Sequence, residues 1–181
     1  MNLDWETIRS QVAWRGRFPV LVDEIRSLED AREMTYTYLG IGVGAVVVLA
    51  LDDADRAVCV RQYRHPMRRV VRELPAGHID RGEDRTLAAH REFEEETGLR
   101  LGHLEHLGSY VPVPSLADFS MHMYFGHTLT PGRQQLDDNE LLEIERVPIR
   151  ELHQAILEGR EPVVSMNYTV LFAAAQGRLP L

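Results

Sequence analysis

Three glutamates, Glu92, Glu95 and Glu96, stand at a spacing that could bring their carboxylates together around a metal ion. On a helix of about 3.6 residues per turn, positions i, i+3 and i+4 fall within an arc of roughly 100°. Like charges at this spacing repel each other, and a divalent cation would offset that repulsion. Oxygen ligands favour Mg²⁺, with Mn²⁺ or Ca²⁺ as alternatives. The run therefore predicts a hard-cation site, although a bare acidic run is also typical of a solvated helix face.

Neighbouring residues would hold these carboxylates in a fixed direction. Ala89 and Phe93 fall on the adjacent stripe of the same helix, which can bury against a sheet. Arg91 precedes Glu95 by one helical turn and can orient its carboxylate. The sequence has no set of His and Cys residues with zinc spacing, so the pattern favours a hard cation over zinc.

The helix that carries the glutamates is expected from about residue 85 to residue 97. Glu83 and Asp84 are acidic residues suited to its start, and Glu83 would cap or orient the helix. Gly98 follows where a left-handed C-terminal cap would lie.

Strands are predicted ahead of this helix. Residues 12–22 and 34–39 carry β-branched and aromatic side chains on either side of a charged stretch, 24–33, and indicate an N-terminal antiparallel piece. The apolar run 42–51 and the segment 57–63 predict a central hairpin.

After the helix, residues 107–113, 122–129 and 141–147 are expected to form strands. Two helices are expected over 148–159 and 164–175. Because hairpins are interrupted by one helix and followed by others, the pattern indicates an α+β fold with a mixed sheet.

Composition excludes several function classes. The 181 residues carry a net charge of -8, which disfavours a nucleic acid polymer as partner. No lysine is present, so Schiff-base chemistry is excluded. The longest apolar run, 43–51, is too short to span a bilayer, and the N-terminus lacks the pattern of a secretory signal, so a cytoplasmic protein without membrane partners is expected. Cys59 is expected to be a small buried hydrophobe.

The stretch 77–99 resembles the Nudix hydrolase family. Gly77, Glu83 and the run 91–99 match every specified position of the Nudix box. The flanking segments 60–64 and 73–77 are similar to the ADP-ribose pyrophosphatase branch of that family. The resemblance implies a Nudix α/β/α sandwich with a mixed central sheet over residues 41–181, preceded by N-terminal antiparallel strands over residues 1–40.

The resemblance also implies a reaction, Mg²⁺-dependent hydrolysis of the diphosphate linkage of a nucleoside diphosphate derivative. Glu92, Glu95, Glu96 and the main-chain carbonyl of Ala76 would be the metal ligands. More than one Mg²⁺, or Mn²⁺, would bridge the diphosphate oxygens and acidify a bound water. With ADP-ribose as the substrate, the products would be AMP and ribose 5-phosphate.

A general base is expected from the acidic loop 137–143. Glu140 is the first choice, with Glu143 and Asp138 as alternatives, because a loop carboxylate can reach a water at the metal. The catalytic set is then Glu140 together with Glu95 and Arg91.

Substrate phosphates and ribose would be bound by a basic cluster over residues 61–72. Arg61, Arg64 and Arg72 are the chosen substrate-binding residues, with Glu73 beside them, because guanidinium groups bind phosphate in bidentate geometry. Surface arginines paired with acidic groups are the alternative interpretation.

The substrate is less closely specified than the reaction. The ADP-ribose branch has a Ser-Pro-Gly turn followed by an acidic residue. Here Pro114 aligns with the turn proline, but Ser115 stands in place of the glycine and Phe119 in place of the acidic residue. Nucleotide sugars therefore remain alternative substrates. A non-catalytic nucleotide-sensing domain is a second alternative, and an acidic Ca²⁺-binding module lacks EF-hand spacing. The family often dimerises through its N-terminal strands, so residues 1–40 are expected to be a dimerising extension of a homodimer.

Overall fold

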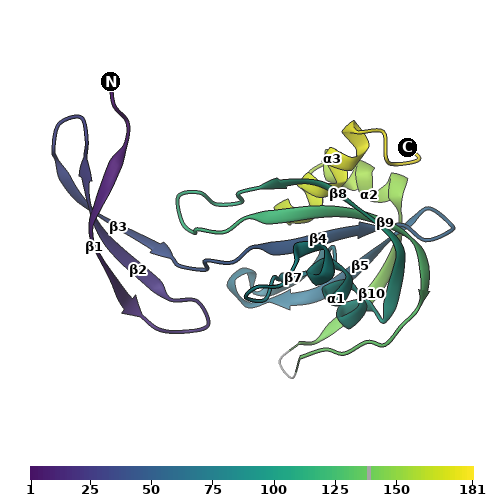
Figure 1. The fold of residues 1–181 in the computed structure, drawn as a ribbon. Coiled ribbons are helices and arrows are strands. Elements are labelled where there is room, and N and C mark those ends of the chain that lie inside the picture. Colours follow the sequence, from purple (N-terminus) through teal and green to yellow (C-terminus); the bar gives the residue numbers. More distant parts are fainter. Residues whose placement is uncertain (138–139) are drawn as a thin grey trace. The chain divides into compact units, whose positions relative to one another are not determined.

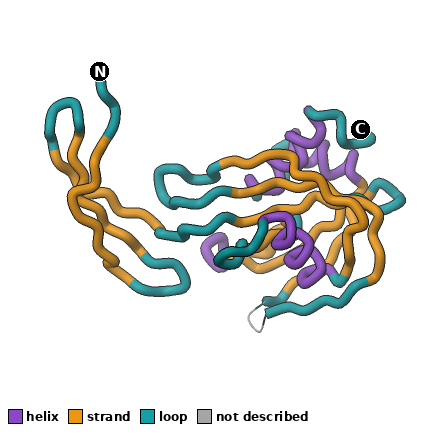
Figure 2. Tube along the Cα trace, viewed as in Figure 1, coloured by secondary structure: helices purple, strands orange, loops and turns teal. Residues whose placement is uncertain are grey.

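The computed structural model describes residues 1–137 and 140–181. The chain forms two compact units. One contains residues 1–43 together with 113–119, and the other contains residues 44–112 and 120–181. The trace of the chain is shown in Figure 1 and its helices, strands and loops in Figure 2.

The first unit is an antiparallel sheet in the order β1-β2-β3. Its strands are β1 (Trp5–Trp14), β2 (Val20–Ser27) and β3 (Glu33–Leu39). The segment 113–119 is joined to β3, because the Leu39 N–H donates to the Leu116 carbonyl at 2.8 Å. Sequence patterning had assigned no residue beyond position 40 to this unit.

The expectation of one strand over 12–22 and a charged connection over 24–33 was wrong. The chain turns between Trp14 and Val20, and residues 24–27 belong to β2. The charged side chains are compatible with a strand because they pair across it, with Glu24 bonded to Arg9 and Arg26 bonded to Glu33. A strand stabilised by such cross-strand charge pairs lacks the alternating apolar residues from which strands are predicted in a sequence.

The second unit contains two sheets and three helices. A mixed sheet has the order β7-β4-β9-β8, in which β4 and β9 are parallel, and an antiparallel sheet has the order β10-β5-β6. The strands are β4 (Ala45–Ala50), β5 (Arg56–Arg64), β6 (Arg69–Glu73), β7 (Ala76–His78), β8 (Leu99–Tyr110), β9 (Met121–Pro131) and β10 (Leu142–Pro148). The helices are α1 (Arg85–Thr97), α2 (Ile149–Leu157), α3 (Val164–Ala175) and a short 3₁₀ turn, His65–Met67.

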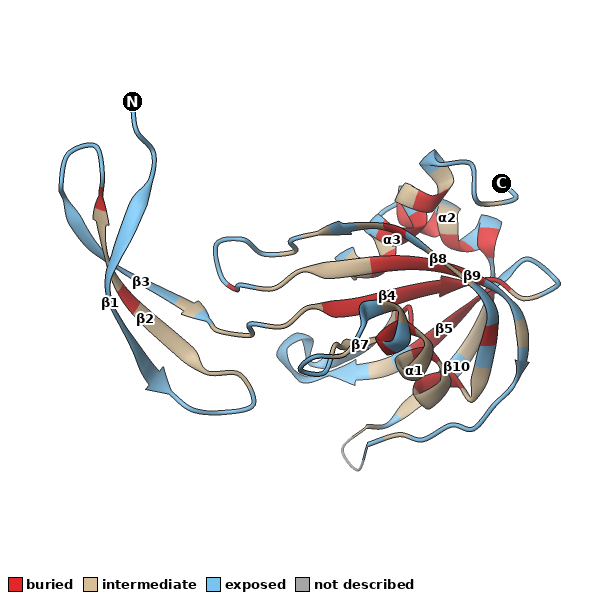
Figure 3. Cartoon of the chain, viewed as in Figure 1, coloured by how far each residue is buried: buried red, intermediate tan, exposed pale blue. Residues whose placement is uncertain are grey.

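The helices cover the sheets from two sides, which makes the second unit an α/β/α sandwich (Figure 1). Val46 and Val48 of β4 pack in the cluster that contains α1. Val47 and Leu49, the intervening residues, pack in the cluster that contains α2 and α3. Because both faces of β4 are buried (Figure 3), its sequence is continuously apolar rather than alternating.

The predicted α+β class and mixed sheet are confirmed, and α1 and α3 have the expected bounds. The predicted central hairpin was wrong, because β4 and β5 belong to different sheets and only Leu51 and Ala57 form an isolated bridge. Strand β8 begins at residue 99 instead of 107. No helix in residues 1–137 and 140–181 is long and apolar enough to cross a membrane.

Candidate active site

Helix α1 is closed at both ends by side-chain and backbone caps. The Asp84 carboxylate accepts hydrogen bonds from the Thr86 N–H at 2.8 Å and the Leu87 N–H at 3.2 Å. At the other end Gly98 has φ of 67°, and its N–H donates to the Glu94 carbonyl at 2.8 Å. The orphan backbone groups of both ends therefore have partners, and the helix begins and ends at defined residues.

One stripe of α1 is anchored in the core. Ala88, Ala89 and Phe93 have no solvent exposure, as the sequence had indicated for Ala89 and Phe93. Glu96 lies at the edge of this stripe with 6% exposure. The rotation of the helix about its axis is thus fixed by apolar packing, and this sets the direction of its carboxylates.

Strand β7 passes directly against the helix at Gly77. A Cβ built on Gly77 would lie 2.0 Å from the Glu92 carboxyl carbon, far inside van der Waals contact. A side chain at position 77 would force the Glu92 carboxylate to move from this place. The close approach of strand and helix explains why a glycine stands ahead of the glutamate run.

Arg91 is the hub of the carboxylate cluster. Its Nε and Nη2 donate to the two oxygens of Glu83, each at 2.8 Å. Its Nη1 donates to Glu92 at 2.8 Å and to Glu95 at 3.0 Å, and Nη2 also reaches the His78 carbonyl at 3.0 Å. The hydrogen bonds from Arg91 lower the pKa of Glu83 and keep it charged. One guanidinium therefore orients three carboxylates at once.

Two carboxylates of the cluster are destabilised as anions. Burial raises the pKa of Glu96 to about 8, against the opposing effect of the Ala76 N–H, which donates to Glu96 at 3.1 Å. Burial also raises the pKa of Glu92, although Arg91 acts in the opposite direction. The charge of Glu140 raises the pKa of both groups, so this loop residue lies within electrostatic reach of the helix.

The donor set has the chemistry of a hard-cation site. No three His, Cys, Asp or Glu side chains of the described residues are already arranged to hold a metal ion. Two observations nonetheless fit a cation: the half-buried carboxylate of Glu92 and the buried carboxylate of Glu96 repel each other, and Gly77 leaves open the space into which Glu92 extends. Arg91 supplies the compensating charge at Glu92 and Glu95 in this structure.

The three candidate bases are placed differently. Glu140 accepts from the Asp137 N–H at 3.2 Å and acts electrostatically on the glutamates of α1. Glu143 lies 3.5 Å from Arg61 and its side chain is 78% exposed. Asp138 lies outside the described residues. Among the described candidates, Glu140 is the one that the structure couples to the carboxylate helix.

The register of β5 and β6 divides the predicted substrate-binding residues between two faces. Arg64 forms a bidentate pair with Glu73, and the charge of Arg64 lowers the pKa of Glu96, so this pair lies on the side of α1. Arg61 lies opposite Arg72 in the register, so these two side chains share a face. Because successive residues of a strand point to opposite faces, this is the face turned away from Arg64, Glu73 and α1.

Arg72 is held by acidic partners on that other face. It pairs with Glu145 at 2.8 Å and also with Glu161, close to the buried Cys59. Burial raises the pKa of the Cys59 thiol to about 12, which agrees with a small buried hydrophobe. The structure therefore brings Arg64 and Glu73, but not Arg61 and Arg72, to the carboxylate helix of the same chain.

The sequence analysis expected Glu83 to cap or orient the helix, but it did not foresee its contact with Arg91 or the contacts of two glutamines after β9. Glu83 holds Arg91 from the side opposite to the glutamate run, a tertiary contact that box spacing alone does not specify. The segment after β9 caps the carboxyl end of α1, where Gln134 donates to the Glu96 carbonyl at 2.8 Å and Gln135 to the Glu95 carbonyl at 2.9 Å. No periodic signal in the sequence marks these glutamines.

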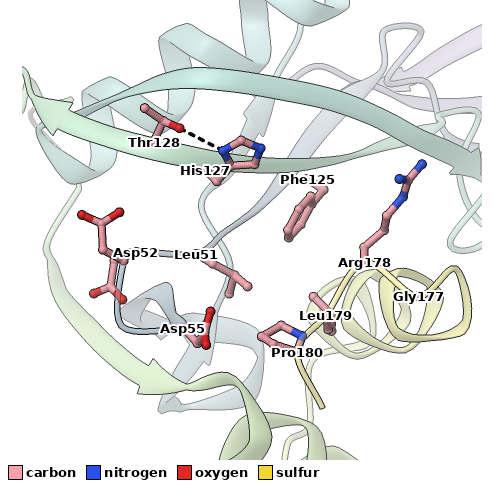
Figure 4. Close-up of a pocket in the computed structure, with 11 residues that line it drawn as sticks. Leu51, Asp52, Asp55, Phe125, His127, Thr128, Gly177, Arg178, Leu179 and Pro180 are labelled. Carbon is pink, nitrogen blue, oxygen red and sulfur yellow. Dashed lines mark hydrogen bonds between the residues drawn. The ribbon is translucent and has the colours of Figure 1, made fainter.

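A surface cavity of about 430 Å³ lies away from this site (Figure 4). It is lined by the connection between β4 and β5, by the middle of β9 and by residues that follow α3: Leu51, Asp52, Asp53, Asp55, Phe125, His127, Thr128, Gly177, Arg178, Leu179 and Pro180. None of these residues belongs to α1 or β7. The cavity therefore does not compete with the carboxylate cluster as the catalytic site.

Comparisons with known proteins agree with this geometry. The methanol dehydrogenase activator of Bacillus methanolicus is 34% identical over 134 residues, covering 71% of this chain and 72% of the relative. The ADP-ribose pyrophosphatase of Mycobacterium tuberculosis is 32% identical over 163 residues, covering 86% of this chain and 76% of the relative. A crystal structure titled as an ADP compounds hydrolase shares the fold, with a TM-score of 0.85 at 22% identity, and covers 99% of this chain and 100% of that one.

The family assignment rests on the extent of a single sequence profile. The profile of the NUDIX domain matches residues 41–166, which include both sheets, α1 and α2. The match spans well over half of the chain and contains every residue of the carboxylate cluster. The chain belongs to the NUDIX domain family.

Proposed function

We propose that the protein is a Mg²⁺-dependent pyrophosphohydrolase that converts ADP-ribose and water into AMP and ribose 5-phosphate. The observation that carries the reaction class is the pair of carboxylates formed by half-buried Glu92 and buried Glu96, whose pKa values are raised beside the charge of Glu140. The name of the Mycobacterium tuberculosis relative supports ADP-ribose as the substrate. A cytoplasmic location is part of the proposal, and cell fractionation tests it.

Mg²⁺ would be held by Glu92, Glu95, Glu96 and the main-chain carbonyl of Ala76, with Mn²⁺ as a substitute. When bound, a divalent cation supplies positive charge against the diphosphate oxygens and makes water more acidic. This charge is needed because the protein has a net charge of -8 and the substrate is itself an anion. In this structure Arg91 donates hydrogen bonds to Glu92 and Glu95 and so orients both carboxylates.

The chain's own residues then have distinct roles. Glu140 accepts a proton from the attacking water as its oxygen approaches one phosphorus. The bond from that phosphorus to the bridging oxygen breaks, and the leaving phosphate keeps the bridging oxygen. Arg64, oriented by Glu73, contributes positive charge on the side of α1 where the phosphates would lie.

Arg61 and Arg72 remain predicted substrate contacts that the geometry of one chain does not support. Their face of β5 and β6 is turned away from α1, and Arg72 already has two acidic partners. Substitution of Arg61 by Ala tests whether Arg61 contacts the substrate or has no role in the site. A raised KM would support a substrate contact, and unchanged kinetics would remove Arg61 from the site.

Substrate choice is tested by turnover across a panel. Purified protein is incubated with Mg²⁺ and ADP-ribose, nucleotide sugars, NADH or dinucleoside polyphosphates, and the nucleotide products are separated by chromatography. The highest kcat/KM is expected for ADP-ribose. Preference for a nucleotide sugar would establish the alternative diphosphatase, and binding without turnover of any member would establish the nucleotide-sensing alternative.

A homodimer through residues 1–40 belongs to the proposal as well. Val12, Met34 and Tyr36 share one face of the N-terminal sheet and are each more than a third exposed. The other face carries charge pairs such as Arg26 with Glu33. An exposed apolar face of this kind supports burial against a second copy. Sedimentation should give a dimer, and Met34→Asp should shift it towards a monomer; a wild-type monomer at working concentration would contradict the proposal.

A further inference from the structure

Two histidines and a serine on β8 and β9 converge on one point outside the carboxylate cluster. The Nε2 atom of His106 lies 3.2 Å from the Ser109 Oγ, and the Nδ1 atom of His122 lies 2.7 Å from the same oxygen. The ring centroids of His106 and His122 are 6.1 Å apart. Two imidazole nitrogens therefore face a common oxygen from neighbouring strands.

An irregularity in β8 creates this arrangement. In a regular strand, residues three positions apart point to opposite faces of the sheet. The register between β8 and β9 shifts between His106 and Gly108, and this bulge brings His106 and Ser109 onto the same face. Ser109 lies directly opposite His122 in the register. Bulges commonly serve to redirect a side chain towards a site.

The hydrogen-bonding capacity of Ser109 constrains the two rings. A serine hydroxyl has one proton, so it can donate to only one of the two nitrogens. The Gly108 backbone also interacts with the His106 ring in the sense that raises the pKa of His106.

Both rings are available as neutral ligands. Burial lowers the pKa of His106 and of His122, and the nearby charge of Arg85 lowers each further. Gly44 leaves room for the His122 ring, since a Cβ there would lie 3.0 Å from Nε2. His106 and Ser109 are exposed, so an ion can reach them from solvent.

We propose that His106, Ser109 and His122 form a second metal site, for a nitrogen-preferring divalent ion such as Zn²⁺. Imidazole suits zinc, copper and nickel, whereas the carboxylates of α1 suit Mg²⁺, so the two sites select different ions. With zinc to nitrogen distances of about 2.0–2.1 Å, the two rings would turn so that both nitrogens point at one ion beside the Ser109 oxygen. Two imidazoles, the serine oxygen and water complete an open site. The positive charge of Arg85 limits its affinity.

Calorimetric titration of the intact protein with Zn²⁺, in excess Mg²⁺ to occupy the carboxylates, tests the site directly. Wild type is expected to bind zinc, and His106→Ala and His122→Ala should each weaken that binding by at least about tenfold. His153→Ala, which removes a histidine of α2, is the matched control and should leave the affinity unchanged. Circular dichroism verifies that each variant is folded.

Two further variants decide where and what the site binds. His103 and His127 stack with centroids 4.5 Å apart on the same two strands, so His127→Ala tests the neighbouring pair. Arg85→Gln should tighten zinc binding because it removes a like charge. The proposal is overturned if His127→Ala abolishes binding while His106→Ala does not, if Arg85→Gln weakens binding, or if wild type binds no zinc.

Discussion

Glu96→Gln is predicted to stabilise the metal-free protein at alkaline pH. Glu96 has a pKa of about 8 in the folded chain, against an ordinary value of 4.5, because the side chain is buried beside Glu92 and Glu140. Between these values the folded state binds the proton more tightly than the unfolded state does. Stability is therefore lost as the pH rises through this window, in contrast to a carboxyl whose pKa is lowered by folding.

The size of the effect follows from the shift. Each pKa unit corresponds to about 1.4 kcal/mol, so the full shift of Glu96 sets a ceiling of roughly 5 kcal/mol on the destabilisation at pH 8. Glutamine occupies nearly the same volume and cannot ionise. We expect Glu96→Gln to exceed wild type by at least about 1 kcal/mol at pH 8, and to differ little at about pH 4, below the ordinary value, where Glu96 is mostly neutral in both the folded and the unfolded state.

Urea unfolding in EDTA, followed by circular dichroism at both pH values, measures this difference. Glu94→Gln is the matched control on the same helix, because hydrogen bonding to Arg100 lowers the pKa of the exposed Glu94 and its substitution should bring no gain. Added Mg²⁺ should then stabilise wild type more than Glu96→Gln. A stability difference between wild type and Glu96→Gln that is the same at both pH values would refute the reasoning.

Five further substitutions, in three comparisons, test the site. Glu140→Gln should lower kcat by about 10²- to 10⁴-fold, as loss of a general base does, while Glu143→Gln should have little effect; steady-state kinetics with the reverse ranking would transfer the role to Glu143. Gly77→Ala should lose both stability and activity, because its Cβ would meet a carboxylate at 2.0 Å, and wild-type urea midpoint and kcat would show that the strand can move aside. Arg64→Ala should reduce kcat/KM, because Arg64 lies on the side of α1. Arg72→Ala should mainly lower the urea midpoint, because it leaves two buried or half-buried carboxylates, Glu145 and Glu161, unpaired. Equal kinetic defects in the two variants would contradict the assignment of these arginines to different faces.

Helix α1 could be predicted from the sequence because several local signals agree. The apolar positions Ala89 and Phe93 follow the helical period, Asp84 is a strong N-cap, and Gly98 provides the left-handed cap. Helix α3 was predicted for a similar reason, since its apolar run has helical length. In both helices the conformation favoured by the local sequence is also the one favoured by tertiary packing.

The bounds of β1 and β2 and the face of the arginines could not be predicted in the same way. Strand β2 alternates charged residues whose partners lie on β1 and β3, so its stability depends on pairing that the local pattern does not contain. Arg61 and Arg64 differ by three positions in one strand and so face opposite sides. Which side contains α1 depends on sheet order, a long-range property.

The carboxylate run itself was found from spacing, but its organisation was not. Spacing placed Glu92, Glu95 and Glu96 on one face, and the structure added that Arg91 is held between them and Glu83. The burial of Glu96, which raises its pKa, depends on how closely β7 approaches the helix. Such contacts arise from packing between distant segments.

The most direct measurement is product formation from ADP-ribose by folded wild type and folded Glu96→Gln, each with Mg²⁺ and with EDTA. We predict AMP and ribose 5-phosphate in equal amounts from wild type with Mg²⁺, no turnover in EDTA, and a rate for Glu96→Gln lower by about 10²-fold or more. Turnover that survives EDTA, or a Glu96→Gln protein as active as wild type, would contradict the account of α1 as the metal-dependent catalytic helix.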